Sequence, residues 1–285
     1  MKIPVTMPFV QEVKADRFWV IGDVHGMVDQ FDALLDKIAD NEIAAGCSVE
    51  SPFTTAIVFI GDICDRGDDS LCTLHLMNYY RITGVTKGNL IMPFYNVLGN
   101  HDEKLLRALN GHKVQPKHGL VKTLFQIGGV DEHTKNMYRD FLATTPLTIR
   151  MVLNEPTENK VAVAVHAAFH DNFYGYGEYD DAFSTDFYNL RQDWSQPRTM
   201  EYAIYGPVRS VSPEGKPDRI AWEDDYNGKY YSFYGHKIVG NHPKFSMSAC
   251  GVDTGCFQSG ILTAVSYPEL TTFQVTGKPA SSQVE

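Results

Sequence analysis

Paired cysteines and long apolar runs are both missing from this 285-residue sequence. Its five cysteines are scattered and include no Cys-x-x-Cys pair, which argues against a disulfide framework and against a zinc knuckle. The longest apolar run, 161–169, contains a histidine and falls well short of the ~20 residues that a membrane-spanning helix needs. We therefore expect a cytoplasmic protein without a membrane segment.

Other signals are absent as well. The first residues contain Pro4 and Pro8 and no small-residue cleavage site, so they do not form a typical secretory signal. No Gly-x-x-x-x-Gly-Lys-Ser/Thr motif is present, which excludes a P-loop kinase module. The net charge of -10 and the pI near 5.4 disfavour broad binding to nucleic acids or anionic membranes, although they leave room for a local basic site.

What the sequence does contain is three carboxylate-rich blocks, each of which closes a short apolar run. The blocks are GDVHG at 22–26, GDICDRG at 61–67 and GNHD at 99–102. The runs before them, 18–21, 55–60 and 91–98, are predicted to be buried strands because they are short, apolar and rich in β-branched residues. All three blocks are then expected at the C-terminal ends of strands.

Apolar residues at helical spacing predict helices between these strands, over 28–39 and over 70–80 with Ser70 as its N-cap. An alternation of strand, block and helix predicts βαβ units, which bring the blocks to one rim of an α/β fold. Further helices are predicted at 103–109, 120–127 and 134–143, and further strands at 148–153, 161–165, 230–234, 247–252, 260–265 and 271–275.

No internal repeat and no convincing linker divides the chain, so a single domain over 1–285 is predicted. Residues 170–230 are aromatic-rich and irregular, and loops with short helices are expected there. Within them, 171–210 are expected to build an extended rim around the site. Residues 277–285 are small and polar and are expected to fray.

Two aspartates, an asparagine and three histidines form a candidate donor set for divalent metals. Asp23 and His25 are two residues apart, so both side chains can face one ion. A histidine after a strand is more often a packed or surface residue, but two of these follow three metal-type blocks in order. Nitrogen and oxygen donors without sulfur favour Mn, Fe, Zn or Mg over a structural zinc site. The set is Asp23, His25, Asp62, Asn100, His166 and His236.

The ordered series of blocks, followed by a strand-end histidine, Gly235-His236 and the VDTGC segment, resembles the phosphoprotein-phosphatase type of calcineurin-like metallophosphoesterases over roughly 17–275. Residues 100–107, the His118-Gly119-Leu120 segment and 219–226 are similar to a narrower group. That group comprises the phosphatase module of bacterial polynucleotide kinase-phosphatases and the related bis(5′-nucleosyl)-tetraphosphatase/protein phosphatases.

This resemblance implies a β-sandwich flanked by helices (αββα), with the active site at the C-terminal ends of its strands. It implies that Asp23, His25 and Asp62 hold one metal. Asp62 would bridge to a second metal held also by Asn100, His166 and His236. Such a pair shares a hydroxide that attacks phosphorus in line. Manganese is the favoured metal, with Fe, Zn, Ni or Mg as alternatives.

The resemblance also implies roles for residues that touch the substrate. His101 would be the general acid, held by Asp65 as its carboxylate partner. Arg66 would clamp the phosphoryl oxygens. Arg219 would be a second phosphate-binding arginine, with Arg191 as the runner-up. Where relatives of this type have Gly-His-Thr-Pro, the chain has Lys237 after the histidine, and this lysine either contacts substrate or reaches solvent.

Three functions remain open, and the substrate is less determined than the chemistry. Hydrolysis of phosphomonoesters, including phosphoproteins, is favoured. The alternative is hydrolysis of nucleotidic substrates, such as diadenosine tetraphosphate or phosphate-terminated or 2′,3′-cyclic polynucleotide ends. A basic stretch that includes Lys104 and His118 could bind extra phosphates, although such a stretch is more often a solvated helix face. A catalytically silent binding protein is disfavoured because every ligand position is intact.

Overall fold

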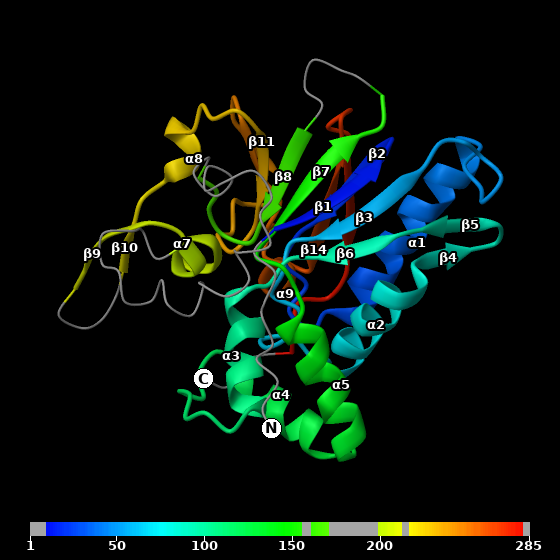
Figure 1. The fold of residues 1–285 in the computed structure, drawn as a ribbon. Coiled ribbons are helices and arrows are strands. Elements are labelled where there is room, and N and C mark those ends of the chain that lie inside the picture. The colour runs from blue at the N-terminus through cyan, green and yellow to red at the C-terminus, as the bar shows by residue number, and fades with distance from the viewer. Residues whose placement is uncertain (1–9, 156–160, 171–198, 213–216, 282–285) are drawn as a thin grey trace.

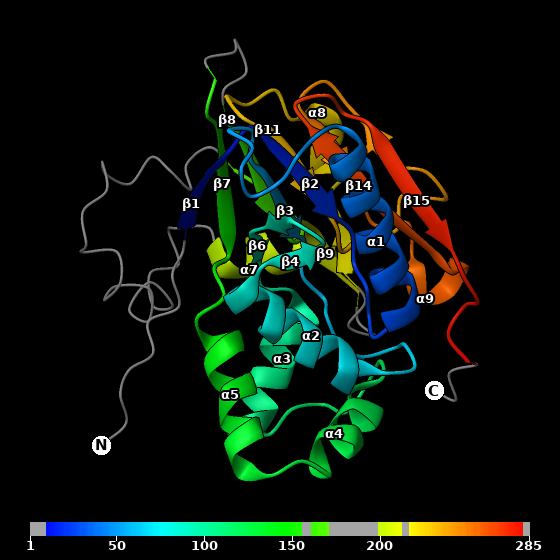
Figure 2. The same ribbon diagram turned by 90° about the vertical axis from the view of Figure 1, so that its right-hand side faces the viewer.

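Two β-sheets face each other, and helices cover both outer faces (Figures 1 and 2). A computed structural model describes residues 10–155, 161–170, 199–212 and 217–281. The six-stranded sheet has the order β1 (Val10–Ala15), β7 (Thr148–Leu153), β8 (Val161–Val165), β11 (Tyr231–Tyr234), β13 (Ala249–Gly251) and β12 (Lys244–Phe245). The five-stranded sheet has the order β15 (Thr272–Thr276), β14 (Ile261–Tyr267), β2 (Arg17–Ile21), β3 (Thr55–Phe59) and β6 (Phe94–Asn96).

The remaining elements cover or border these sheets. Two-stranded ribbons are formed by β4 (Val85–Lys87) with β5 (Leu90–Met92) and by β9 (Val208–Val211) with β10 (Pro217–Arg219). The helices of the described residues are α1 (Val28–Ala44), α2 (Ser70–Thr83), α3 (Asn100–Leu109), α4 (Leu120–Gly128), α5 (Glu132–Ala143), α7 (Thr199–Tyr205), α8 (Trp222–Asp225) and α9 (Cys256–Ser259). In Figure 1, α1 and α2 lie on one side of the sheets and α7 and α8 on the other.

Alternation along the strands creates three layers of core. In β3, Ala56 and Val58 pack between the two sheets. Ile57 and Phe59 point the other way and pack in the layer that contains α1. In β8, Val163 packs on the opposite outer face, together with α7. Because strand side chains alternate in direction, each strand contributes to two layers. The predicted αββα sandwich is confirmed.

The three block-bearing strands, β2, β3 and β6, lie side by side and run parallel. Their C-terminal ends therefore meet at one edge, as predicted. The run 91–98 is not one strand, however. It divides at Pro93 into β5, which pairs with β4, and β6, which pairs with β3. Proline lacks the N–H that a continuous strand would donate, although its carbonyl accepts from Ile57.

Some local predictions were wrong. The N-cap of α2 is Asp69, whose side chain accepts from the amide of Cys72 at 2.9 Å, and Ser70 is the first helical residue. Strand β1 and the β9–β10 ribbon were not predicted. The predicted rim segment lies largely outside the described residues, and 199–210 contribute α7 and part of β9. In the predicted tail, Ser281 donates to Asp68, so the described part of this tail is anchored.

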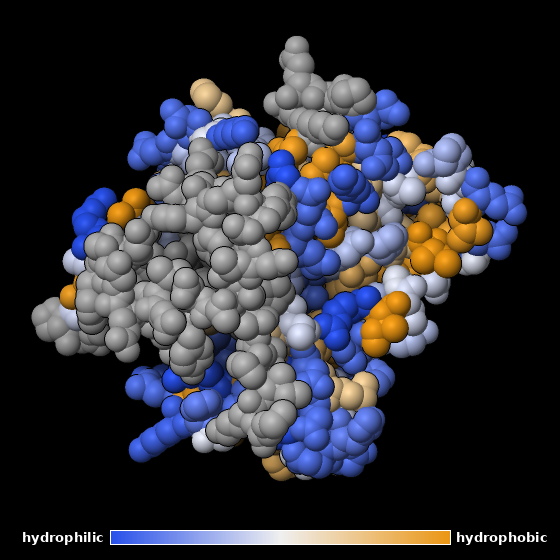
Figure 3. All heavy atoms as spheres, viewed as in Figure 1, coloured by the Kyte–Doolittle hydropathy of each residue, from blue (hydrophilic) through white to orange (hydrophobic). Residues whose placement is uncertain are grey.

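None of the helices in the described ranges is long and apolar enough to span a membrane. Figure 3 shows hydrophilic side chains over much of the described surface in that view, with hydrophobic ones gathered where Figure 1 draws β4 and β5. Ile91 of β5 is 51% exposed. Exposed apolar side chains of this kind are ordinary on folded proteins.

A buried carboxylate explains why α1 continues to Ala44, beyond its predicted end at residue 39. Glu42 is fully buried and accepts hydrogen bonds from Trp19 at 2.9 Å and Thr55 at 2.7 Å. Arg17 lies 3.0 Å from it, completing an ion pair. Burial acts to raise the pKa of Glu42, but the bonds from Thr55 and Trp19 and the charge of Arg17 lower it below its usual value of 4.5. A buried charge is tolerated when it is paired and hydrogen-bonded in this way.

We expect Glu42→Gln to lower the free energy of unfolding by about 2–4 kcal/mol, because it leaves buried donors and Arg17 incompletely paired. Glu269→Gln is the matched control, since Glu269 also pairs with Arg17 at 2.8 Å but its side chain is 39% exposed. The control should cost less than about 1 kcal/mol in urea denaturation. The pKa of Glu42 is lowered in the folded state. Its contribution to the free energy of unfolding is therefore complete above the unfolded-state pKa and is lost as the pH falls through the folded-state pKa. Equal losses in the two variants would contradict this account.

Candidate active site

The strand-end blocks are joined to one another by backbone hydrogen bonds. The amide of His25 donates to the carbonyl of Asp62 at 2.9 Å, and that of Gly26 to Ile63 at 2.8 Å. The turn after β11 joins the turn after β8, because Gly235 donates to the carbonyl of His166 at 2.7 Å. These bonds fix side chains from separate strands in one site.

Left-handed backbone conformations are concentrated in this site. Among the described residues, seven other than glycine have a positive φ, and six of them belong to the site predicted from the sequence. Such conformations cost free energy and persist where the surrounding structure enforces them, often at functional sites. The six are His25, Asp62, Asp65, Arg66, His118 and His236.

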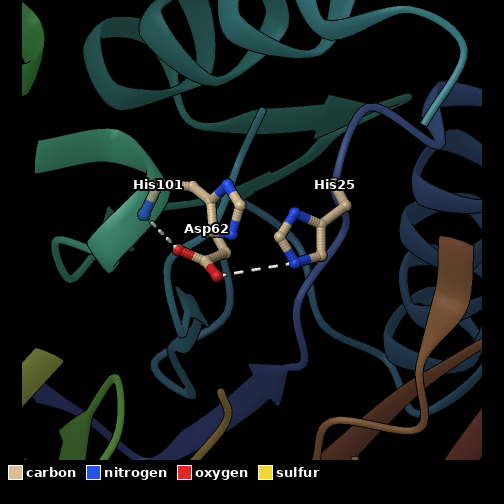
Figure 4. A group of neighbouring side chains, drawn as sticks. All are labelled: His25, Asp62 and His101. Carbon is tan, nitrogen blue, oxygen red and sulfur yellow. Dashed lines mark hydrogen bonds and ion pairs between the residues drawn. The ribbon is translucent and has the colours of Figure 1, made fainter. Parts of the chain in front are cut away.

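Asp62 lies at the centre of the donor set (Figure 4). Its Oδ2 is 3.5 Å from Nε2 of His25, and its Oδ1 is 3.4 Å from Nε2 of His166. Oδ1 also accepts from the amide of His101 at 2.9 Å. One carboxylate therefore faces donors on both sides, which is the geometry that a bridging ligand needs.

The orientations of two histidine rings are fixed by backbone carbonyls. Nδ1 of His25 lies 2.8 Å from the carbonyl of Cys64, and Nδ1 of His166 lies 2.9 Å from that of Ile60. A carbonyl only accepts, so each Nδ1 is the donor and each Nε2 is directed toward Asp62. Metal-binding histidines are commonly held in this way.

Two groups of donors could each hold a metal ion. In each group the donor atoms lie within 4.8 Å of one another: His25, Asp62 and His101 in the first, and Asp62, His166 and His236 in the second. Asn100 adjoins the second group, because its Oδ1 is 3.1 Å from Nε2 of His166 and 2.8 Å from Nδ1 of His236. The sequence set and these groups share their members, except that His101 takes the place of Asp23 in the first.

Asp23 lies beside the second group, and only one of its carboxylate oxygens accepts a hydrogen bond. Its Oδ2 accepts from the amide of His236 at 3.0 Å, while its buried Oδ1 has no hydrogen-bond partner among the described residues. Gly235 permits this arrangement, because a Cβ there would collide with Oδ1. Burial, and repulsion from Asp253, raise the pKa of Asp23 well above its usual value.

The buried carboxylate of Asp62 is stabilised by the histidines that surround it. Burial would raise the pKa of Asp62, but His166 and His101 hold it well below its usual value. Burial would lower the pKa of His166, but the attraction of Asp62 raises it to about 10. Together with the orphaned oxygen of Asp23 and the sulfur-free donors, this charge pattern fits a site for divalent metal ions.

His101 is held by a carboxylate on one side and lies beside an arginine on the other. Its Nδ1 is 2.7 Å from Oδ2 of Asp65, and the other oxygen of Asp65 accepts from Thr123 at 2.6 Å. Nη2 of Arg66 lies 3.4 Å from Nε2 of His101, and the guanidinium lies 4.6 Å from the ring centroid of Phe257. Nδ1 of His101 is therefore paired with Asp65, and Nε2 faces Arg66.

Basic side chains border both groups. Beside the first, the ring of His118 lies 6.4 Å from that of His101, and Lys104 donates to the carbonyl of Lys117 at 3.1 Å. Beside the second, Arg219 donates to the carbonyl of Tyr205, whose ring is 6.2 Å from that of His236.

Of two further residues named from the sequence, the structure describes Lys237 and does not describe Arg191. Lys237 does more than reach solvent, since its Nζ lies 2.7 Å from Oε1 of Glu223, a buried carboxylate of α8. Arg191 lies outside the described residues. The choice between Arg191 and Arg219 therefore stays a prediction.

Sequence reasoning assigned no part to two buried residues that support the site. Asp102 accepts from the amides of Asp62 at 2.9 Å, Ile63 at 2.9 Å and Gly99 at 3.0 Å. Thr123 anchors Asp65 from a separate helix, α4. Asp102 is part of the GNHD block, so the sequence motif already pointed to it. Thr123 contacts Asp65 across 58 positions of chain, and no local motif indicates this contact.

Asp102→Ala should lower the free energy of unfolding by about 3–5 kcal/mol, because three buried amides lose their acceptor. Asp140→Ala is the matched control, an exposed aspartate of α5 whose loss should cost no more than about 0.5 kcal/mol. Thermal and urea unfolding measure both. If the variants lose similar stability, Asp102 does not join the two blocks in the way described.

Solved structures share this fold. A crystal structure of a candidate diadenosine tetraphosphatase superposes with a TM-score of 0.58 and 19% identity, over 95% of this chain and 99% of that one. A protein serine/threonine phosphatase from Saccharomyces cerevisiae gives a TM-score of 0.53 and 15% identity, over 97% of this chain and 86% of that one. At these identities the likeness concerns the fold.

Relatives with curated names are similar in sequence over most of their length. The asymmetrical bis(5′-nucleosyl)-tetraphosphatase PrpE of Halalkalibacterium halodurans is 29% identical over 259 residues, which cover 89% of this chain and 91% of that protein. PrpE of Bacillus thuringiensis is 28% identical over 260 residues, which cover 91% and 94%.

The calcineurin-like phosphoesterase family profile matches residues 16–240, which include all three blocks, the strand-end histidines and Arg219. The family implies divalent metal ions and phosphoric ester hydrolysis, and the buried donor groups around Asp62 fit both. The chain therefore belongs to the calcineurin-like phosphoesterase family and is a phosphoric ester hydrolase.

Proposed function

We propose that the chain hydrolyses nucleotidic polyphosphates, with bis(5′-nucleosyl) tetraphosphates as the substrate class. The observation that carries this proposal is the similarity to asymmetrical bis(5′-nucleosyl)-tetraphosphatases over about nine tenths of both chains. It favours the nucleotidic alternative over the phosphomonoester and phosphoprotein function expected first. The protein phosphatase from yeast supports that first expectation only at the level of the fold.

In this proposal Asp62, Asp23 and His25 would hold one metal ion. A second ion would be held by Asp62 together with the residues around the Asn100 amide. Those residues are Asn100, His166 and His236. When bound, the ions would supply Lewis acidity toward phosphoryl oxygens and lower the pKa of a water molecule. The mixed donors suit manganese, with Fe, Zn, Ni or Mg as alternatives.

The residues around this pair orient the substrate and move one proton. His101 donates a proton from Nε2 to the leaving oxygen, while Asp65 holds the ring through Nδ1. Arg66 binds two phosphoryl oxygens with its planar guanidinium, whose position beside Phe257 is already fixed. Arg219 acts as a second phosphate ligand beside His236.

A linear tetraphosphate also needs positive charge away from the reacting phosphorus. Lys104 supplies it beside His101, in the region where the leaving polyphosphate would extend, and the ring of His118, whose pKa is lowered by burial and by Arg66, offers a hydrogen-bonding group there. A single phosphomonoester has no groups to place there. This basic flank supports the nucleotidic substrate.

The substrate proposal predicts a higher kcat/KM for diadenosine tetraphosphate than for p-nitrophenyl phosphate or a phosphoserine peptide, with manganese supplied. A 2′,3′-cyclic nucleotide completes the comparison as the other nucleotidic class. The tetraphosphate places negative charge beside Lys104, so Lys104→Met should lower its kcat/KM by about 5–10-fold while changing the kcat/KM of p-nitrophenyl phosphate little. Preference for the phosphopeptide would reverse the proposal in favour of the phosphoprotein function.

The acid assignment predicts that the effect of His101→Asn depends on the leaving group. Glycerol phosphate releases an aliphatic alcohol that needs a proton, so its kcat should fall by roughly 10²–10⁴. The nitrophenolate ion leaves without a proton, so p-nitrophenyl phosphate should lose much less. His112→Asn, at an exposed position beyond α3, serves as the control and should leave both rates unchanged. Equal losses on both substrates would remove the assignment.

A further inference from the structure

A cavity of about 440 Å³ adjoins the second donor group, and apart from Arg219 its lining has no part in the chemistry described so far. It lies between α7 and the β9–β10 ribbon, and its volume falls within the range of small-molecule sites. The lining residues that matter here are Tyr202, Tyr205, Pro207, Val208, Pro217 and Arg219.

The cavity and the metal-binding region share two of these residues. Tyr205 lines the cavity and also meets the ring of His236 edge-on, with 6.2 Å between ring centroids. Arg219 lines the cavity and donates to the Tyr205 carbonyl, so its guanidinium is held between the two regions. A phosphate bound beside His236 would therefore have the group attached to it directed toward the cavity.

Most of the lining is suited to a flat ring, and Glu201 adds a carboxylate to it. Tyr202 and Tyr205 offer aromatic faces, and the two prolines and Val208 offer rigid apolar contacts. The ring of Tyr202 is held in place, because it packs against the core on the outer face of the six-stranded sheet and contacts the ring of His170. Pre-ordered rings bind planar ligands with little loss of conformational freedom.

We propose that this cavity binds the nucleoside attached to the phosphate that is attacked, with the base against Tyr202 and Tyr205 and the phosphate on Arg219. The inference rests on the proposed function and adds one point to it. The base contributes to the binding affinity independently of the polyphosphate chain. Aromatic stacking on a base is worth about 1–3 kcal/mol, which is about 5–150-fold in affinity.

The test compares two competitive inhibitors of p-nitrophenyl phosphate hydrolysis, AMP and ribose 5-phosphate, which differ only in the base. For the unaltered protein, AMP should bind roughly tenfold more tightly or better. Val208→Glu places a carboxylate in the cavity and should bring the ratio of the two inhibition constants close to one, with ribose 5-phosphate changed less than about threefold.

The same ribbon provides a matched control. Val211 lies three positions further along β9, is 62% exposed and does not line the cavity. Val211→Glu adds the same charge and should preserve the ratio. Tyr202→Leu keeps apolar volume against the core, removes the ring and should lower the ratio as Val208→Glu does.

The outcomes separate this inference from the proposed function. If diadenosine tetraphosphate is hydrolysed but AMP binds no better than ribose 5-phosphate, the cavity does not hold the base and only the inference is overturned. A ratio that survives Val208→Glu also overturns it. If p-nitrophenyl phosphate is hydrolysed and diadenosine tetraphosphate is not, the proposed function is overturned instead.

Discussion

The position of one carboxylate, Asp62, determines most of this site. It stands at a strand end with a φ of 59°, a conformation that a non-glycine residue adopts at a cost. Asp102 offsets that cost by accepting from the amides of Asp62 and of the residue after it. The carboxylate is thereby presented to His25 on one side and to His166 on the other. Without this turn, the two donor groups would have no common member.

The sandwich serves this arrangement by bringing distant parts of the chain to the same edge. His166 and His236 come from the six-stranded sheet, whereas the three blocks come from the five-stranded sheet. The two sheets pack through alternate residues of strands such as β3 and β8. The site therefore depends on the packing between the sheets, and a local unfolding of either sheet would separate the donor groups.

The sequence was sufficient for the parts of the site that local patterns encode. Short apolar runs that end in glycine-flanked turns located the strands that carry Asp62 and Asn100. What it did not reveal depends on partners far away in the chain. Strand β1 pairs with β7, with Val10 opposite Thr148, and nothing local indicates this. The extension of α1 to Glu42 likewise depends on Arg17 and Thr55, whose positions only the folded chain defines.

Chemistry and specificity occupy different parts of this fold. In the proposed function the donors around Asp62 hold the centre that hydrolyses a phosphorus–oxygen bond, and any phosphoric ester that reaches this centre presents that same bond. In the proposed function, discrimination comes from what surrounds them: Lys104 and His118 beside one group, and Arg219 with the aromatic cavity beside the other. These residues lie on helices, a turn and a ribbon outside the two sheets. Substrate preference in this fold can therefore change while the hydrolytic centre stays the same.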